Sequence, residues 1–119
     1  MSGKATRCAR GSAWLAKLAA LALSIGLAAA PAMAAEIVYI AAKADLPFWD
    51  TVGKGVRAAA ESGGYTFSML DSKLSADAQL ANVRQAIERR AAGIVISPTN
   101  SKSAEDALRL AKKANTPIA

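Results

Sequence analysis

The sequence predicts an α/β fold, a doubly wound parallel sheet, for the part of the chain that follows residue 34. Runs of apolar and β-branched residues begin near residues 36, 65, 94 and 117, and helical stretches separate them. This spacing is the length of a βαβ unit. The first run, residues 36–42, is continuously β-branched and apolar, which is typical of a strand that helices cover on both faces.

The first 34 residues have the order of a secretory signal peptide. Four basic residues and no acidic residue precede an apolar run of thirteen residues, and the small-residue triplet Ala32-Met33-Ala34 follows Pro31. The apolar run is too short to be a stable membrane anchor. We expect cleavage after Ala34 and a soluble product in the periplasm, comprising residues 35–119; a buried Ala/Leu helix is the alternative interpretation.

Removal of this segment changes the charge and the chemistry that remain. The chain has 15 basic and 9 acidic residues, and loss of the four basic residues leaves 11 against 9, a net charge of +2 rather than +6. The high isoelectric point is therefore weak evidence for a nucleic-acid partner. Cys8 would also be removed, and the chain has no histidine. These losses exclude disulfides, a cysteine nucleophile, histidine acid/base chemistry and a typical zinc site, and we expect no cofactor.

The first strand and helix are predicted at residues 36–42 and 50–62. The helix places a row of small apolar residues on one side, and Gly63-Gly64 ends it. That row comprises Val52, Val56, Ala59 and Ala60.

The second strand is predicted at residues 65–70, and Ser75 is suited to cap the helix that follows. Leu80, Val83 and Ile87 recur in this helix at helical spacing, and we expect it to end at Gly93.

The third strand is predicted at residues 94–97. The next helix is expected to start near Ser101 or Ser103, where Ser103 and Asp106 approximate a capping box, and to end at Asn115. Its buried face is expected to comprise Ala107, Leu108 and Ala111. A fourth strand begins with the last residues, so we expect the sequence to be the beginning of a longer protein.

The loops after the first and third strands are the expected ligand site. If the first strand is central, these loops flank the point where the strand order reverses, and ligands of open parallel sheets bind there. Phe48 and Trp49 lie in the first of the two loops. An aromatic ring covers the apolar face of a sugar ring while polar side chains bind its hydroxyls. Packing of one or both aromatics under the first helix is an equally open alternative.

Polar residues of both loops are further candidates for ligand contact. Lys43 and Asp45 can supply charged hydrogen bonds, and Asn100 with Thr99 can reach the ligand or serve as loop and cap residues. Asp50 is expected to cap the first helix. Asp71, which ends the second strand, is expected to be a turn residue away from the site.

Several motifs together resemble the ribose- and galactose-type periplasmic binding proteins, the type I solute receptors of sugar ABC importers. These motifs are D-x-P-F-W, GKGVRAAAES, a strand ending in LDS, QLANVRQAI, GIVISPTNS and NTPIA, in that order. The resemblance covers residues 36–119. It implies the first part of the N-terminal lobe of a two-lobed fold that closes on a monosaccharide and performs no reaction, with a membrane permease as partner.

The resemblance also implies roles for single residues. The aromatics after the proline, Phe48 and Trp49 here, clamp the sugar ring, and a lysine near the end of the first strand, here Lys43, binds the sugar. A polar residue commonly precedes the proline, whereas this chain has Leu46, which argues against ribose itself. The implied cleft needs a second wall, so we expect residues 35–119 alone to fold marginally and to bind no sugar measurably.

Two other functions remain open on the sequence alone. A periplasmic sensor that presents a small molecule to a membrane receptor kinase or chemoreceptor would use the same fold, and neighbouring genes would distinguish it from an importer. An exported Rossmann-like enzyme is more remote, because the single G-x-G, Gly53-Lys54-Gly55, falls inside the first helix and lacks the third glycine.

Overall fold

The first strand lies at the centre of a parallel sheet in this computed structural model, which describes residues 33–119. β1 (Glu36–Ala41) pairs with β2 (Thr66–Asp71) on one side and with β3 (Gly93–Ile96) on the other, which gives the order β2-β1-β3. The predicted fold class is therefore confirmed, and the condition on which the expected ligand site depends, a central first strand, is met. The predicted signal peptide comprises residues 1–34, and its residues 1–32 lie outside the described part of the chain.

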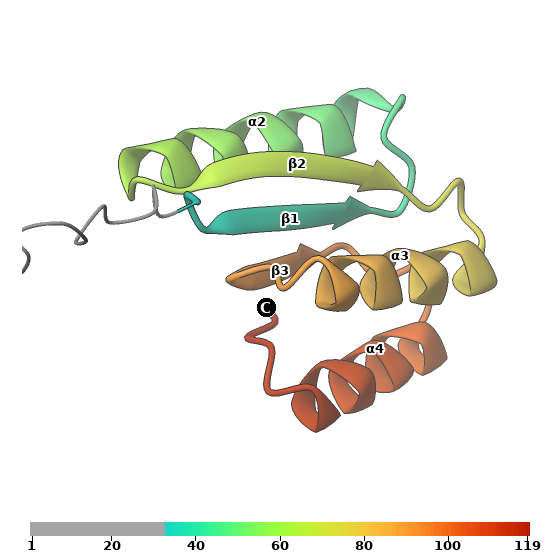
Figure 1. Cartoon of the computed structure of the whole chain (residues 1–119). Coiled ribbons are helices and arrows are strands. Elements are labelled where there is room, and N and C mark those ends of the chain that lie inside the picture. Colours follow the sequence, from blue (N-terminus) through green and yellow to red (C-terminus); the bar gives the residue numbers. More distant parts are fainter. Residues whose placement is uncertain (1–32) are drawn as a thin grey trace, which may run out of the picture. The chain divides into compact units, whose positions relative to one another are not determined.

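The helices cover both faces of the sheet, as a doubly wound fold requires. In Figure 1, α2 (Pro47–Ser62) lies on one face, and α3 (Ala76–Glu88) and α4 (Ser101–Lys113) lie together on the other. The last residues return to the outer edge of β3, where Ile118 forms a parallel bridge with Ile94. The expected fourth strand thus begins in the predicted place.

The face with α3 and α4 holds an aliphatic core. Val38 and Ile40 of the central strand pack there with Ile94 of β3, Val83 of α3 and Ala107 of α4, and all five are buried. These residues come from both strands and both helices, so their shared burial holds α3 and α4 on the sheet.

On the opposite face of the sheet, the backbone of α2 approaches the strands closely. Tyr39 and Met69 are register neighbours in β1 and β2, and Gly53 of α2 lies against them. A Cβ at Gly53 would be 2.9 Å from the sulfur of Met69 and 3.4 Å from Cδ1 of Tyr39. The absence of a side chain at Gly53 therefore lets α2 approach the sheet closely. At the edge, the guanidinium of Arg57 stacks 4.9 Å from the ring centroid of Phe67.

The start of α2 corrects the sequence prediction. The helix begins at Pro47 rather than Asp50, so Phe48 and Trp49 lie in its first turn and not in a loop. Pro47 occupies the first helical position, for which its fixed φ is suited. The N-cap is Leu46, whose side chain makes no capping hydrogen bond, and Asp50 instead pairs with Lys54 at 2.7 Å. The predicted capping role of Asp50 is wrong.

Other helix ends are partly as predicted. Ser75 accepts a hydrogen bond from the N–H of Ala78 and caps α3, and Asn115 adopts a left-handed conformation (φ 54°) after α4. The helix α3 ends at Glu88, because Arg90 is also left-handed (φ 56°), and Gly93 belongs to β3.

Two predicted faces also differ from the structure. Ala59 is exposed and Leu108 is 51% exposed, whereas Leu110 of α4 packs against the core. The predicted Ser103–Asp106 capping box is replaced by one between Asn100 and Ser103.

Candidate ligand-binding site

The β1–α2 loop, residues 42–46, presents charged side chains at the carboxyl end of the central strand. The N–H of Leu46 donates to the carbonyl of Lys43 at 3.3 Å and closes a turn. The Nζ of Lys43 lies 3.8 Å from a carboxylate oxygen of Asp45, and these side chains are 35% and 72% exposed. An ion pair this exposed contributes about 0–1 kcal/mol, so it restrains the two side chains only weakly.

The two aromatics follow this loop directly. Phe48 and Trp49 contact each other edge to face, with ring centroids 5.4 Å apart and an interplanar angle of 88°. Phe48 is 68% exposed, and Trp49 is half-buried. Burial of an aromatic ring of this size would stabilise the fold, and Phe48 does not obtain that burial. The exposure of Phe48 argues against a core role for this ring, whereas the half-buried Trp49 is partly covered by the fold.

Asp71 ties this loop to the end of β2. One of its carboxylate oxygens accepts hydrogen bonds from the N–H groups of Ala44 at 3.0 Å and Lys73 at 2.9 Å. The bond from Ala44 is the main cause that holds the pKa of the Asp71 carboxyl below its ordinary value. In addition, the N–H of Leu74 donates to the carbonyl of Ala42 at 2.8 Å.

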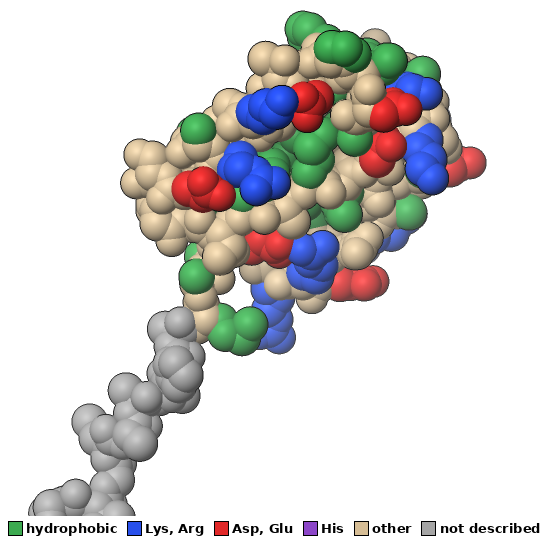
Figure 2. All heavy atoms as spheres, turned by 90° about the horizontal axis from the view of Figure 1, so that it is seen from above, with side chains coloured by type: hydrophobic (Ala, Val, Ile, Leu, Met, Phe, Trp, Pro, Cys, Tyr) green, Lys and Arg blue, Asp and Glu red, His purple; other side chains and the backbone are tan. Residues whose placement is uncertain are grey.

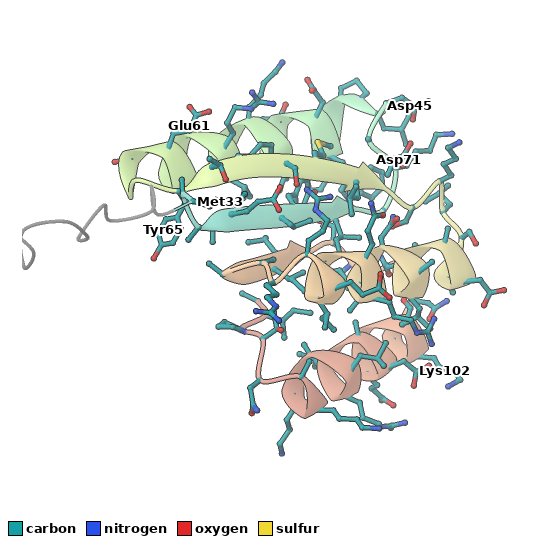
Figure 3. The ribbon with its side chains drawn as sticks, in the orientation of Figure 1. Met33, Asp45, Glu61, Tyr65, Asp71 and Lys102 are labelled. Atoms are coloured by element: carbon teal, nitrogen blue, oxygen red, sulfur yellow. The ribbon has the colours of Figure 1, made fainter. Side chains whose placement is uncertain are left out.

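The turn role predicted for Asp71 is confirmed by its bond to Lys73, and Asp71 ends β2, one strand away from the switch point between β1 and β3. Its bond to Ala44, which ties it to the β1–α2 loop, was not predicted. Figure 3 shows Asp45 and Asp71 at the same end of the sheet, with Glu61 and Tyr65 at the opposite end. A carboxylate that ends the strand next to β1 was the signal in the sequence, because neighbouring parallel strands end at one edge.

The β3–α4 loop, residues 97–100, forms the other side of the expected site. Its first residue is bonded to the central strand, because the N–H of Ser97 donates to the carbonyl of Ile40 and the hydroxyls of Ser97 and Tyr39 lie 2.8 Å apart. At the end of the loop, Asn100 Oδ1 accepts from the N–H of Ser103 at 2.8 Å. Asn100 is therefore a helix cap, and it is also exposed at the mouth.

The loops therefore place the predicted residues at the same edge, in two groups. Lys43, Asp45, Phe48 and Trp49 belong to the first loop and the helix turn after it, and Asn100 belongs to the second loop. The sequence reasoning missed Gln79, a buried residue of α3 that bonds the second loop at Thr99.

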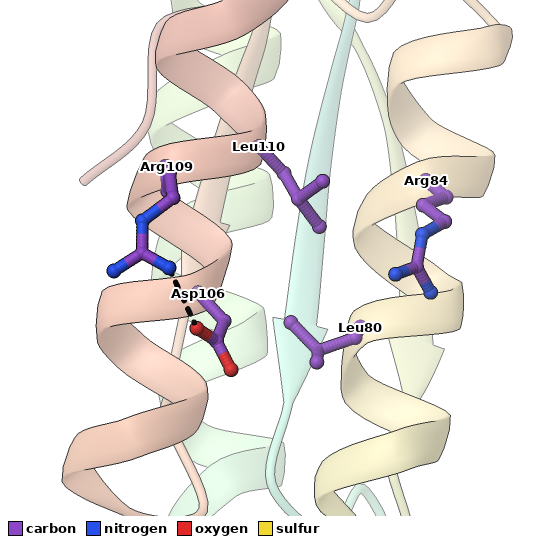
Figure 4. Close-up of a pocket in the computed structure, with 5 residues that line it drawn as sticks. All are labelled: Leu80, Arg84, Asp106, Arg109 and Leu110. Atoms are coloured by element: carbon purple, nitrogen blue, oxygen red, sulfur yellow. Dashed lines mark ion pairs between the residues drawn. The ribbon is translucent and has the colours of Figure 1, made fainter.

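Two surface grooves lie away from this mouth. One groove of about 210 Å³ runs between α3 and α4, with Leu80 and Leu110 inside and Arg84 and Arg109 at its sides (Figure 4). Its Asp106 pairs with Lys102 at 2.9 Å and with Arg109 at 3.5 Å. The second groove lies at the outer edge of β3 beside Pro117.

Charged side chains of both signs are mixed on the face of the described part that Figure 2 shows, rather than gathered by sign. Within residues 33–119, no helix has the length and apolar character needed to cross a membrane. The same residues include no cluster of three or more potential metal-binding side chains.

Residues 37–119 match the family model described as a periplasmic binding protein domain. The chain therefore belongs to the periplasmic binding protein family, as its sequence motifs had suggested. It is 32% identical to the ribose import binding protein RbsB of Escherichia coli, over 86% of this chain and 36% of that protein. The chain thus spans about a third of the length of this relative.

Solved structures show the same fold. An ABC transporter solute-binding protein of Bacillus halodurans with bound myo-inositol superposes with a TM-score of 0.63 at 24% identity, over 71% of this chain and 29% of that one. A periplasmic ribose ABC transporter protein of Conexibacter woesei gives a TM-score of 0.65 at 21% identity, over 71% and 28% of the two chains. The type I periplasmic binding protein fold is therefore shown for the part that the chain contains.

Proposed function

We propose that this chain forms the first part of a periplasmic solute-binding protein that captures a sugar or sugar-like molecule for an ABC importer. The observation that carries the proposal is the aromatic pair. Phe48 and Trp49 stand edge to face in the first turn of α2, and Phe48 is mostly exposed at the edge where ligands of parallel sheets bind. The family and the ribose-binding relative support this assignment.

The proposed contacts follow from the chemistry of a sugar ring. The exposed ring of Phe48, with Trp49 beside it, covers the apolar C–H face of the ligand. Lys43 and Asp45 bind hydroxyl groups with charged hydrogen bonds, and the amide nitrogen of Asn100 donates to another. No group of this set is placed to activate a nucleophile, and the proposed function is binding without reaction. Leu46 precedes Pro47 where a polar side chain would add a hydroxyl contact, so a ligand other than ribose is favoured.

The test uses the full-length mature protein, purified from the periplasmic fraction, with its intact mass giving the N-terminus. Calorimetric titration with D-ribose, D-glucose and myo-inositol identifies a binding probe. The variant Phe48→Ala should then weaken binding by about 1–3 kcal/mol, as expected for loss of an aromatic contact buried by the ligand. Because Phe48 is exposed without ligand, the unfolding midpoint of the unliganded protein should stay nearly unchanged. Trp49→Ala should weaken binding similarly, with a small loss of stability from its buried part.

Tyr65 offers a matched control. This aromatic is 41% exposed at the opposite end of the sheet (Figure 3), so Tyr65→Ala should leave the affinity unchanged. Unaltered affinity of Phe48→Ala and Trp49→Ala, together with a large loss of stability, would show that the aromatics serve packing. Equal affinity losses in the Tyr65 and Phe48 variants would show that the effect does not come from the mouth.

A further inference from the structure

Gln79 is a fully buried amide in the first half of α3. Its Nε2 donates to the carbonyl of Ser97 at 2.9 Å and lies 3.4 Å from the hydroxyl of Ser72. Its Oε1 accepts from the N–H of Thr99 at 2.9 Å and from the hydroxyl of Ser103 at 3.0 Å. Both ends of the amide are thus engaged, as a buried polar group requires.

Most of these partners belong to a single structural unit. Ser97 and Thr99 lie in the β3–α4 loop, and Ser103 lies in the first turn of α4. The hydroxyl of Ser103 also accepts from the N–H of Asn100 at 3.2 Å, which completes the capping box. A continuous path of hydrogen bonds therefore runs from Gln79 through Ser103 to Asn100.

We propose that Gln79 is a positioning residue that fixes the β3–α4 loop in the conformation that presents Asn100 to the ligand. The proposal rests on the function proposed above and concerns the same site. Gln79 is itself buried beneath the loop, so it acts through Thr99 and Ser103 rather than by touching the ligand. The loop has only four residues between β3 and α4, and Gln79 bonds two of them.

The chemistry of this position is specific for a side-chain amide. One end must donate to the carbonyl of Ser97 while the other accepts from the N–H of Thr99, and the glutamine amide offers both. Methionine has a similar length and no strong hydrogen-bonding group. The variant Gln79→Met therefore removes the bonds to the loop with little change in volume.

The experiment compares Gln79→Met with Val83→Ala in the full-length protein. Val83 is fully buried in the same helix, one turn further along, and makes apolar contacts with the core. Its truncation lowers stability by leaving a cavity and does not touch the loop bonds. Hydrogen exchange of residues 97–103 without ligand is measured first, followed by the dissociation constant for the sugar probe that binds the wild-type protein best.

Gln79→Met should speed hydrogen exchange at Thr99 at least tenfold and raise the dissociation constant of the sugar probe about tenfold. Val83→Ala should change neither the exchange rate at Thr99 nor the dissociation constant. Equal effects in the two variants would overturn the proposal, because they would trace to global stability. Faster exchange with unaltered affinity would also overturn it. If no probe binds the wild-type protein, the proposed function fails, and unchanged exchange in Gln79→Met would still separately refute the positioning role. If Gln79→Met does not fold, Ser103→Ala is tested in its place, because it removes the link from Gln79 to Asn100. It should also speed exchange at Thr99 and weaken binding of the sugar probe.

Discussion

The two loops at the mouth of the sheet are built in opposite ways. The β1–α2 loop is held from outside, by the Asp71 carboxylate and by the helix α2, while its own Lys43 and Asp45 side chains stand exposed. The β3–α4 loop is held through buried side chains beneath it, and its Asn100 already serves as a helix cap. The comparison teaches that the first loop can vary its side chains for a ligand at little cost to the fold, whereas the second cannot.

Disruption of the contact between α2 and the sheet is expected to have the largest effect on the free energy of unfolding. Gly53 lies against Met69, and a Cβ at residue 53 would be 2.9 Å from the sulfur of Met69. The larger side chain of valine would overlap this sulfur, so Gly53→Val should lower the free energy of unfolding by about 1–3 kcal/mol. Gly55 is the matched control, because nothing lies within 4 Å of a Cβ at that position of the same helix. Gly55→Val should change the stability by less than about 0.5 kcal/mol. Urea unfolding of the full-length protein measures both values.

Similar losses at Gly53 and Gly55 would mean that the loss at Gly53 does not come from the approach of α2 to the sheet. The external support of the first loop would then rest on Asp71 and on the bond from Leu74 to Ala42. The comparison between the loops would be weakened accordingly.

Substitution of Asp71 is expected to have the next largest effect on the free energy of unfolding. Asp71→Ala removes the acceptor of two backbone N–H groups and should lower the free energy of unfolding by about 1–2 kcal/mol, a value reduced for the partial exposure of the carboxylate. Asp106 is the control, because it also has a lowered pKa, mainly through a hydrogen bond from Lys102, yet it is bonded only within α4. Asp106→Ala should leave unfolding at neutral pH nearly unchanged.

The pH dependence separates charge from simple hydrogen bonding at Asp71. The folded-state pKa of this carboxyl lies below the unfolded value of about 3.9, so its contribution is present above that value. The contribution is lost as the pH falls through the folded pKa. The difference in unfolding free energy between the wild type and Asp71→Asn should therefore be constant above about pH 5 and shrink on acidification. A difference that grows with acidification would contradict the assigned bonds.

The sequence predicted the part of this architecture that depends on local pattern and on the topology of βαβ units. The central β1, the cap at Ser75 and the left-handed Asn115 all follow from such rules and are confirmed. The start of α2 was missed because Asp50 is a good capping residue in isolation, whereas Pro47 starts the helix one turn earlier without a side-chain cap. Propensity alone could not decide between them.

The supports of the site depended on tertiary contacts and were harder to predict. Glutamine is usually a surface residue, so the helical pattern around Gln79 gave no sign of its burial. Its partners Ser97 and Ser103 lie far along the chain, and only the packing of α3 beside the second loop brings them together. Leu108 shows the converse: it is apolar and lies beside the buried Ala107, yet it is mostly exposed.

The smallest expected effect tests whether the second loop contributes contacts as well as shape. Asn100→Ala removes the cap of α4 and should lower the free energy of unfolding by about 1 kcal/mol. Asn100→Asp keeps an oxygen acceptor for the N–H of Ser103, so its stability should match that of the wild type.

In Asn100→Asp the amide donor becomes a carboxylate oxygen, so a hydrogen bond from residue 100 to the ligand would be lost while the loop stays capped. We expect the affinity for the sugar probe to fall by about three- to tenfold, in line with one hydrogen bond at roughly 0.5–1.5 kcal/mol and less than the loss expected for Phe48→Ala. Titration of the two Asn100 variants against the wild type measures this. Wild-type affinity in both Asn100→Ala and Asn100→Asp would mean that Asn100 only caps α4, and that the side chains of the first loop and the aromatic turn make the contacts on this side of the ligand.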